Sequence, residues 1–188
     1  MCGFDPLRRY SLSLALALAF RPRLFPGIGP RGVCGEPHLA TKRVAIFHYR
    51  YASGMKWVTR EKVKVDRVAC PWLIKKFIDP EAEFVFLSHH TDWSKIRDGI
   101  VYDVPNCELG HHGEDVSFNS ILQRYALSDP ALVLLGEIVR AADSHPAKPH
   151  SAGEGLRWIA SGFSALGLSD QEILEREFIV YDALYAEC

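Results

Sequence analysis

The chain has 188 residues, of which 48% are hydrophobic and 24% are charged, and its formal net charge is −1. This length and balance are typical of one globular domain with its own core. The five cysteines are widely spaced and form no C-x-x-C pair, which argues against a disulfide framework and a four-cysteine zinc site. No phosphate-binding loop or dinucleotide fingerprint occurs, so no motif supports flavin or nicotinamide chemistry.

The first 54 residues differ in character from the rest. Residues 8–20 combine a basic start with an apolar run that is too short to span a bilayer as a helix, and residues 21–54 are rich in Gly, Pro and Arg without periodicity. Two interpretations remain open. Either residues 1–54 are a poorly ordered extension, or upstream sequence included by an over-long gene model, before a natural start at Met55 in a cytoplasmic protein, or residues 8–20 are the signal peptide of an exported one. Arginines and prolines at the expected cleavage position favour the first.

The folded domain is expected to span residues 55–188, without a membrane span. This part holds 14 basic and 21 acidic residues, so it would repel a nucleic-acid backbone and no direct nucleic-acid binding is expected. The spacing of apolar residues predicts a short extended lead-in and then a helix within residues 63–78, with Pro71 near its first turn or kinking it. Residues 82–88 and 99–104 are short, β-branched and aromatic, which predicts two strands.

Helical signals dominate the rest of the domain. Asp115 is a candidate cap for a helix over 115–127, and Asp129 with Pro130 predicts a helix start for 129–143. Two Ser-x-x-Glu capping boxes, at Ser151 and Ser169, predict two further helices. The expected fold class is α+β, a predominantly helical single domain with a small β-sheet near its start.

The stretch "CELGHHGEDVSF", residues 107–118, gathers ligand-type side chains between a predicted strand and a predicted helix. His111 and His112 could bind a metal there, because imidazole is the commonest transition-metal ligand. The alternative is a solvated loop in which one histidine caps the helix. Cys107 is expected to be the more exposed thiol, and Cys70 to be packed in the core.

For four other polar residues or pairs, a functional role has to be weighed against an ordinary structural or solvent-exposed one. Asp143 ends a predicted helix, where a carboxylate is electrostatically disfavoured, and this favours a functional role. Glu137 lies opposite the apolar stripe of the same helix and should face solvent unless a second layer covers it. Asp66 either caps its own helix or belongs to a site, and Arg67 with Lys75 either binds an oxyanion or stays solvated.

The segment "VDRVACPWLIKKFIDPEAEFVFL", residues 65–87, resembles the chromate resistance protein family, specifically the C-terminal domain of ChrB-type proteins. Residues 108–127, 129–143 and 182–185 resemble further family blocks in the same order, so the resemblance covers about residues 57–186. It implies an association with chromate resistance, and the longer family members are described as regulators or sensors. The residues before Met55 resemble neither the DNA-binding nor the rhodanese-like domain of those members.

The resemblance implies that His111, Glu137 and Asp143 occupy family positions, and with Asp66 we expect them to form a metal-binding pocket. Such ligands suit manganese, iron or zinc, and Arg67 and Lys75 would attract an oxyanion such as chromate. Candidates of second rank are Glu108, His112, His145 and Cys107. Two alternatives stay open: a metal-dependent enzyme acting in oxidative or sulfur stress, and a metal-free regulatory interaction module.

Overall fold

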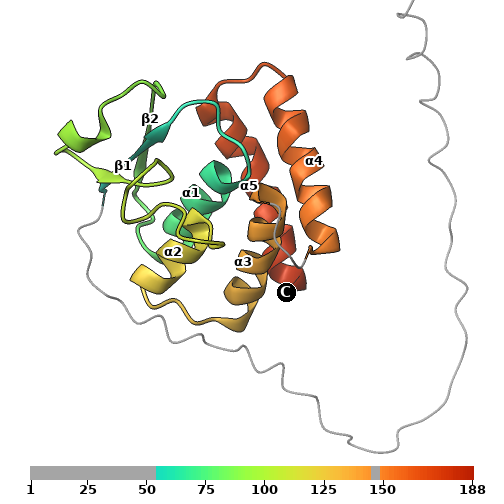
Figure 1. Ribbon diagram of the computed structural model, residues 1–188. Coiled ribbons are helices and arrows are strands. Elements are labelled where there is room, and N and C mark those ends of the chain that lie inside the picture. Colours follow the sequence, from blue (N-terminus) through green and yellow to red (C-terminus); the bar gives the residue numbers. More distant parts are fainter. Residues whose placement is uncertain (1–53, 145–148) are drawn as a thin grey trace, which may run out of the picture. The chain divides into compact units, whose positions relative to one another are not determined.

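The computed structural model describes residues 54–144 and 149–188 (Figure 1). The predictions for residues 1–53, including the signal-like run, and for His145 lie outside the described residues. Within them the chain forms five α-helices and a three-stranded parallel sheet, so it is a mixed, mostly helical domain with its sheet near the start. This confirms the expected fold class.

The sheet has the order β2-β1-β3, with all strands parallel. Its members are β1 (Lys56–Arg60), β2 (Glu83–Leu87) and β3 (Ile100–Val101). The first strand was not predicted, although it is central and Val58 pairs with both neighbours, Val85 and Val101. Because the chain continues from β1 to β2 on one side and places β3 on the other, the sheet has a topological switch point at the carboxyl ends of β1 and β3.

Helix α1 (Val65–Phe77) connects β1 to β2 and lies at the centre of the domain. It is covered by α2 (Ser117–Arg124), α3 (Pro130–Asp143) and α5 (Asp170–Glu187). Its face toward them is apolar, and Trp72, Leu73 and Ile74 are fully buried. Pro71 lies in the interior of α1, beyond the first turn.

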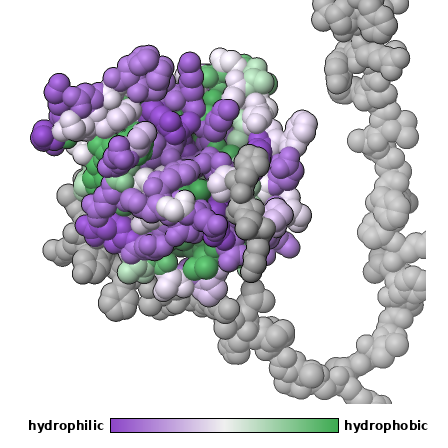
Figure 2. All heavy atoms as spheres, viewed as in Figure 1, coloured by the Kyte–Doolittle hydropathy of each residue, from purple (hydrophilic) through white to green (hydrophobic). Residues whose placement is uncertain are grey.

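The remaining elements are a short 3-10 helix, η1 (Trp93–Lys95), and α4 (Ser151–Ala165), which packs closely on α3. A Cβ atom at Gly153 would lie only 2.6 Å from the Cβ atom of Ala141, so only glycine allows this approach of the two helices. None of the helices in residues 54–144 and 149–188 is long and apolar enough to cross a membrane. The face seen in Figure 2 is mostly hydrophilic, with smaller apolar areas between the polar side chains.

Helix starts follow the predictions in two cases and depart from them in two. The Asp129 carboxylate accepts a hydrogen bond from the Ala131 amide (2.9 Å), and the capping box that begins at Ser169 is complete. The cap predicted at Asp115 is wrong, because α2 begins without a side-chain cap from its preceding residues. The cap predicted at Ser151 is also wrong, since the preceding His150 accepts from the Ala152 amide through Nδ1.

A carboxyl group of α5 is buried among apolar side chains. Glu177 is 0% exposed and belongs to the buried stripe of α5, between Leu174 and Tyr181. Neither of its carboxyl oxygens has a hydrogen-bond partner among the described residues. Burial raises the pKa of Glu177 to about 7, so the folded protein keeps this carboxyl group protonated over a range of pH in which an exposed glutamate is ionised.

Candidate metal centre

Asp66 joins the first two helices of the domain. It lies in the first turn of α1 with its side chain 1% exposed, and it accepts hydrogen bonds from the backbone amides of Ser117 (2.7 Å) and Phe118 (3.1 Å). Asp66 therefore caps α2, which explains why α2 needs no cap of its own. The alternative that Asp66 caps its own helix is wrong, because the N-cap position of α1 is Lys64.

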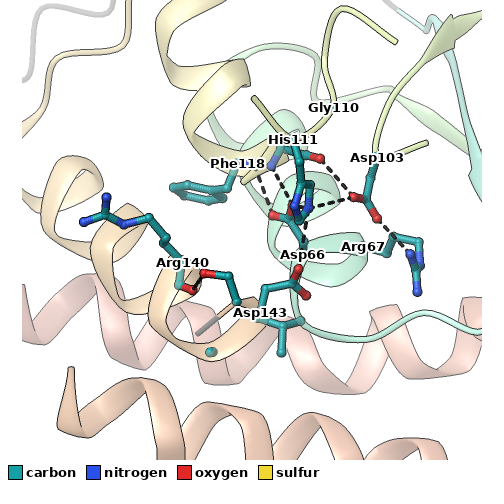
Figure 3. Close-up of polar contacts among 12 residues, drawn as sticks. Asp66, Arg67, Asp103, Gly110, His111, Phe118, Arg140 and Asp143 are labelled. Atoms are coloured by element: carbon teal, nitrogen blue, oxygen red, sulfur yellow. Dashed lines mark hydrogen bonds and ion pairs between the residues drawn. The ribbon is translucent and has the colours of Figure 1, made fainter. Parts of the chain in front are cut away.

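His111 reaches over Asp66 from the loop that precedes α2 (Figure 3). Its Nε2 atom lies 3.2 Å from Asp66 Oδ2, 3.3 Å from Asp103 Oδ1 and 3.5 Å from Asp143 Oδ2. The imidazole is 44% exposed, whereas the three carboxylates are 1%, 4% and 23% exposed. His111 thus forms the solvent-facing side of an acidic pocket.

Asp103 is a member of this cluster that the sequence analysis did not single out. It lies two residues after the end of β3, and its backbone adopts a positive φ of 48°. Its Oδ2 atom accepts from Arg67 (2.9 Å) and its Oδ1 atom from the Ser117 hydroxyl (2.9 Å). The available signal was its place at the carboxyl end of a predicted strand, where functional side chains of parallel sheets gather.

The charges in the cluster perturb one another. The pKa of His111 is raised to about 10, chiefly by hydrogen bonds to Asp103 and Asp66. Burial raises the pKa of Asp143 to about 6, and the negative charges of Asp66 and Asp103 add to this effect. At Asp103, burial acts upward but is outweighed by His111, Arg67 and Ser117, so its pKa is lowered. The raised pKa of His111 and the contribution of Asp66 and Asp103 to the raised pKa of Asp143 indicate that negative charge in the cluster favours a bound cation.

The geometry is that of a group that could hold a metal ion. One ligand atom each from Asp66, His111 and Asp143 lie within 4.8 Å of one another. Around a divalent ion with ligands at about 2.1 Å, neighbouring ligand atoms are roughly 3.0–3.4 Å apart, close to the nitrogen–oxygen distances seen here. The three distances from His111 are longer than those of charge-assisted hydrogen bonds, which are usually about 2.7–2.9 Å. One imidazole with carboxylates suits zinc, manganese or iron.

The structure does not bring Glu137 into this group. Its side chain is exposed, as its position opposite the apolar stripe of α3 predicted, and it precedes Asp143 by six residues, about 9 Å along the helix axis. Lys75 is likewise exposed, in the last turn of α1 and about 12 Å along the axis from Arg67. Arg67 itself is engaged by Asp103 and by the Lys62 carbonyl (3.1 Å).

Three candidates of second rank, Glu108, His112 and Cys107, lie among the described residues, and none of them belongs to the group that could hold a metal. His112 is exposed, and its Nε2 atom lies 2.8 Å from the Glu108 carbonyl oxygen. The Glu108 carboxylate instead accepts from Arg124 (3.1 Å). Cys107 is half-buried, and burial raises the pKa of its thiol, while Cys70 is fully buried as expected.

Comparison with known proteins places these residues in a family. Residues 57–188, which include the whole cluster, match the family model described as ChrB, C-terminal domain. The chain is 31% identical over 152 residues to Protein ChrB of Cupriavidus metallidurans, an alignment that covers 80% of this chain and 46% of that protein. The chain thus spans about half the length of this relative, and no solved structure matches. The chain belongs to the ChrB C-terminal domain family.

Proposed function

We propose that this chain binds one divalent ion, zinc, manganese or iron, through Asp66, His111 and Asp143, and that it acts with this ion in the response to chromate. The observation that carries the proposal is the convergence of these side chains, which come from α1, a loop and the end of α3. Resemblance to the chromate resistance family supplies the biological context.

The charge balance of the pocket supports a divalent ion. Asp66, Asp103 and Asp143 carry three negative charges when ionised, and Arg67 is paired with Asp103. Two negative charges then remain in a largely buried site, and a 2+ ion would balance them. Protonated His111 balances only one of them. A metal-free interaction module, by contrast, would not need these side chains to converge.

The exposure of the site favours a second candidate, a metal-dependent enzyme. His111 is 44% exposed, and a cavity of about 170 Å³ adjoins it. Three protein ligands with an open side are typical of catalytic metal sites, whereas structural sites are closed by four ligands. A metal held here would supply Lewis-acid activation of water or substrate. In both candidates Asp103 holds Arg67 in place.

Metal titration with a matched pair of variants tests the proposal. Purified protein is stripped with a chelator, and uptake of zinc, manganese and iron(II) is measured by calorimetry and elemental analysis. We expect one equivalent of metal in the wild type, roughly 100-fold weaker binding in His111→Ala, and no change in His112→Ala. At a free metal concentration 100 times the Kd, the wild type should gain about 2.7 kcal/mol in unfolding free energy.

Two outcomes would contradict the proposal. The metal site fails if the wild type takes up no stoichiometric metal, or if His111→Ala and His112→Ala bind it equally. The link to chromate is tested separately. The gene for this protein is replaced in its own bacterial strain by the His111→Ala or the His112→Ala variant, and growth in chromate is compared with that of the wild type. Equal chromate tolerance of the His111→Ala strain and the wild type would leave the metal site without that role.

A further inference from the structure

A small cavity lies beside the metal cluster, at the switch point of the sheet. Its volume is about 170 Å³, below the roughly 300–1,000 Å³ of sites for drug-sized ligands. It is lined by Arg60, Asp103, Val104, Pro105, Asn106 and His111. Arg60 ends β1 and Asp103 follows β3, so the cavity occupies the position where open parallel sheets bind their ligands.

Arg60 is the unusual member of this lining. It is half-buried, and its Nε atom is buried without a hydrogen-bond partner among the residues that the structure describes. No carboxylate of the described segments lies within ion-pair distance of its guanidinium, in contrast to Arg67, which is paired with Asp103. Arg67 Nε is likewise buried without a partner, so what distinguishes Arg60 is its charge: it helps to lower the pKa of Asp103, but the close carboxylate contact of Asp103 goes to Arg67.

The segment from Asp103 to Asn106 borders the same cavity and has two positive φ angles, 48° at Asp103 and 62° at Asn106. Asp and Asn tolerate this region better than other residues, yet such conformations still cost free energy and gather at binding sites. The turn places Asn106, whose side-chain amide carries two further donors, among the lining residues of the cavity.

We infer that this cavity binds a small inorganic oxyanion, with the Arg60 guanidinium as its principal donor and the metal site as its neighbour. The inference rests on the proposed metal binding. Without metal, protonated His111, Arg60 and Arg67 balance Asp66, Asp103 and Asp143, and the net charge of these groups is 0. A divalent ion that takes the place of the His111 proton changes the sum to +1, so the cavity accepts an anion once the metal site is filled.

Metal and anion are consequently coupled. Because each ion raises the affinity of the other by the same factor, sulfate should tighten metal binding as much as the metal tightens sulfate binding. The sequence predicted that Arg67 and Lys75 would bind the anion, whereas the structure leads us to assign this function to Arg60. Arg67 remains the partner that holds Asp103.

Sulfate titration of the metal-loaded full chain tests the inference, with the metal identified by the preceding titrations and calorimetry as the readout. We expect wild-type protein to bind one sulfate, and Arg60→Gln to bind it roughly 10- to 100-fold more weakly, as for loss of a charge-assisted hydrogen-bond donor. Arg60→Lys keeps the charge without the fork of donors and should fall between them. Arg176→Gln, a change at an exposed arginine on α5, should match the wild type.

Metal uptake is measured first in every variant, so the two proposals fail in different ways. If wild type and Arg60→Gln bind metal alike but also bind sulfate alike, the anion site is refuted and the metal site stands. The same holds if metal-loaded wild type binds no sulfate. If the wild type binds no metal, the metal site is refuted and the anion site falls with it. If Arg60→Lys binds metal as the wild type does, the variant is folded, and weaker sulfate binding then cannot be attributed to misfolding.

Discussion

Substitution of the buried Glu177 by glutamine should change how stability depends on pH. The carboxyl pKa is about 7 in the folded protein, against an ordinary value of 4.5. Below pH 4.5 both folded and unfolded chains hold the proton, and Glu177 adds no pH dependence. As pH rises to 7 the unfolded chain loses its proton first, so the wild type loses stability; above pH 7 the loss is complete. A shift of about 2.5 units corresponds to about 3 kcal/mol.

Glutamine keeps the shape of the side chain but does not titrate. Its amide is also buried without partners, and the resulting cost is independent of pH. We therefore expect Glu177→Gln to gain up to about 3 kcal/mol relative to the wild type between pH 4.5 and pH 8. Groups of the metal cluster titrate in both proteins, and their contributions largely cancel in the difference.

The assay is urea unfolding of metal-stripped protein at half-unit steps from pH 4.5 to pH 8.5. Glu175→Gln serves as the control, because Glu175 lies on the exposed side of the same helix, and its difference from the wild type should stay nearly constant. If the curves for wild type and Glu177→Gln run parallel across this range, the carboxyl group is not held neutral by burial and the reasoning is refuted.

Three further predictions follow from the packing. Asp66→Ala should lower the unfolding free energy of metal-stripped protein by about 2–4 kcal/mol, measured in urea, because two α2 amides lose their acceptor; a loss below 0.5 kcal/mol would contradict the capping role. Gly153→Ala should cost about 1–3 kcal/mol, since its Cβ would collide with Ala141, while Gly155→Ala has open space and should stabilise α4 by about 0.5–1 kcal/mol. Cys70 is fully buried and should react with a thiol reagent only when the chain unfolds; labelling of the native protein at Cys70 would contradict its burial.

Local patterns predicted where the helices lie, because apolar stripes are encoded within a few residues, but two of the four predicted caps, at Asp115 and Ser151, were wrong. Asp129 and Ser169 begin helices where their sequences indicate, and the helical position of Glu137 gave its exposure correctly. Strand β1 was missed because "KWVTR" alternates only weakly, and its partners lie 27 and 43 residues away in the registers Trp57–Phe84 and Trp57–Ile100. Its pairing is decided by tertiary contacts.

The candidate site was predictable in part for the same reason. Asp66, His111 and Asp143 each carried a local signal or matched the family pattern, and the structure places them together. Asp103 carried no signal beyond its place after a strand, and Arg60 ended a strand that was not recognised. What the sequence could not provide was the direction in which each side chain points once α1, β3 and α3 have docked.

The capping of α2 by Asp66 has a consequence for measuring the site in solution. The amides of Ser117 and Phe118 are protected by a residue 51 and 52 positions earlier in the chain, so their protection depends on the docking of α1 against α2. Hydrogen–deuterium exchange at these two amides therefore reports opening of the cluster directly. Their exchange rates, compared with those of amides deep inside α1, would measure how far the site opens independently of the core.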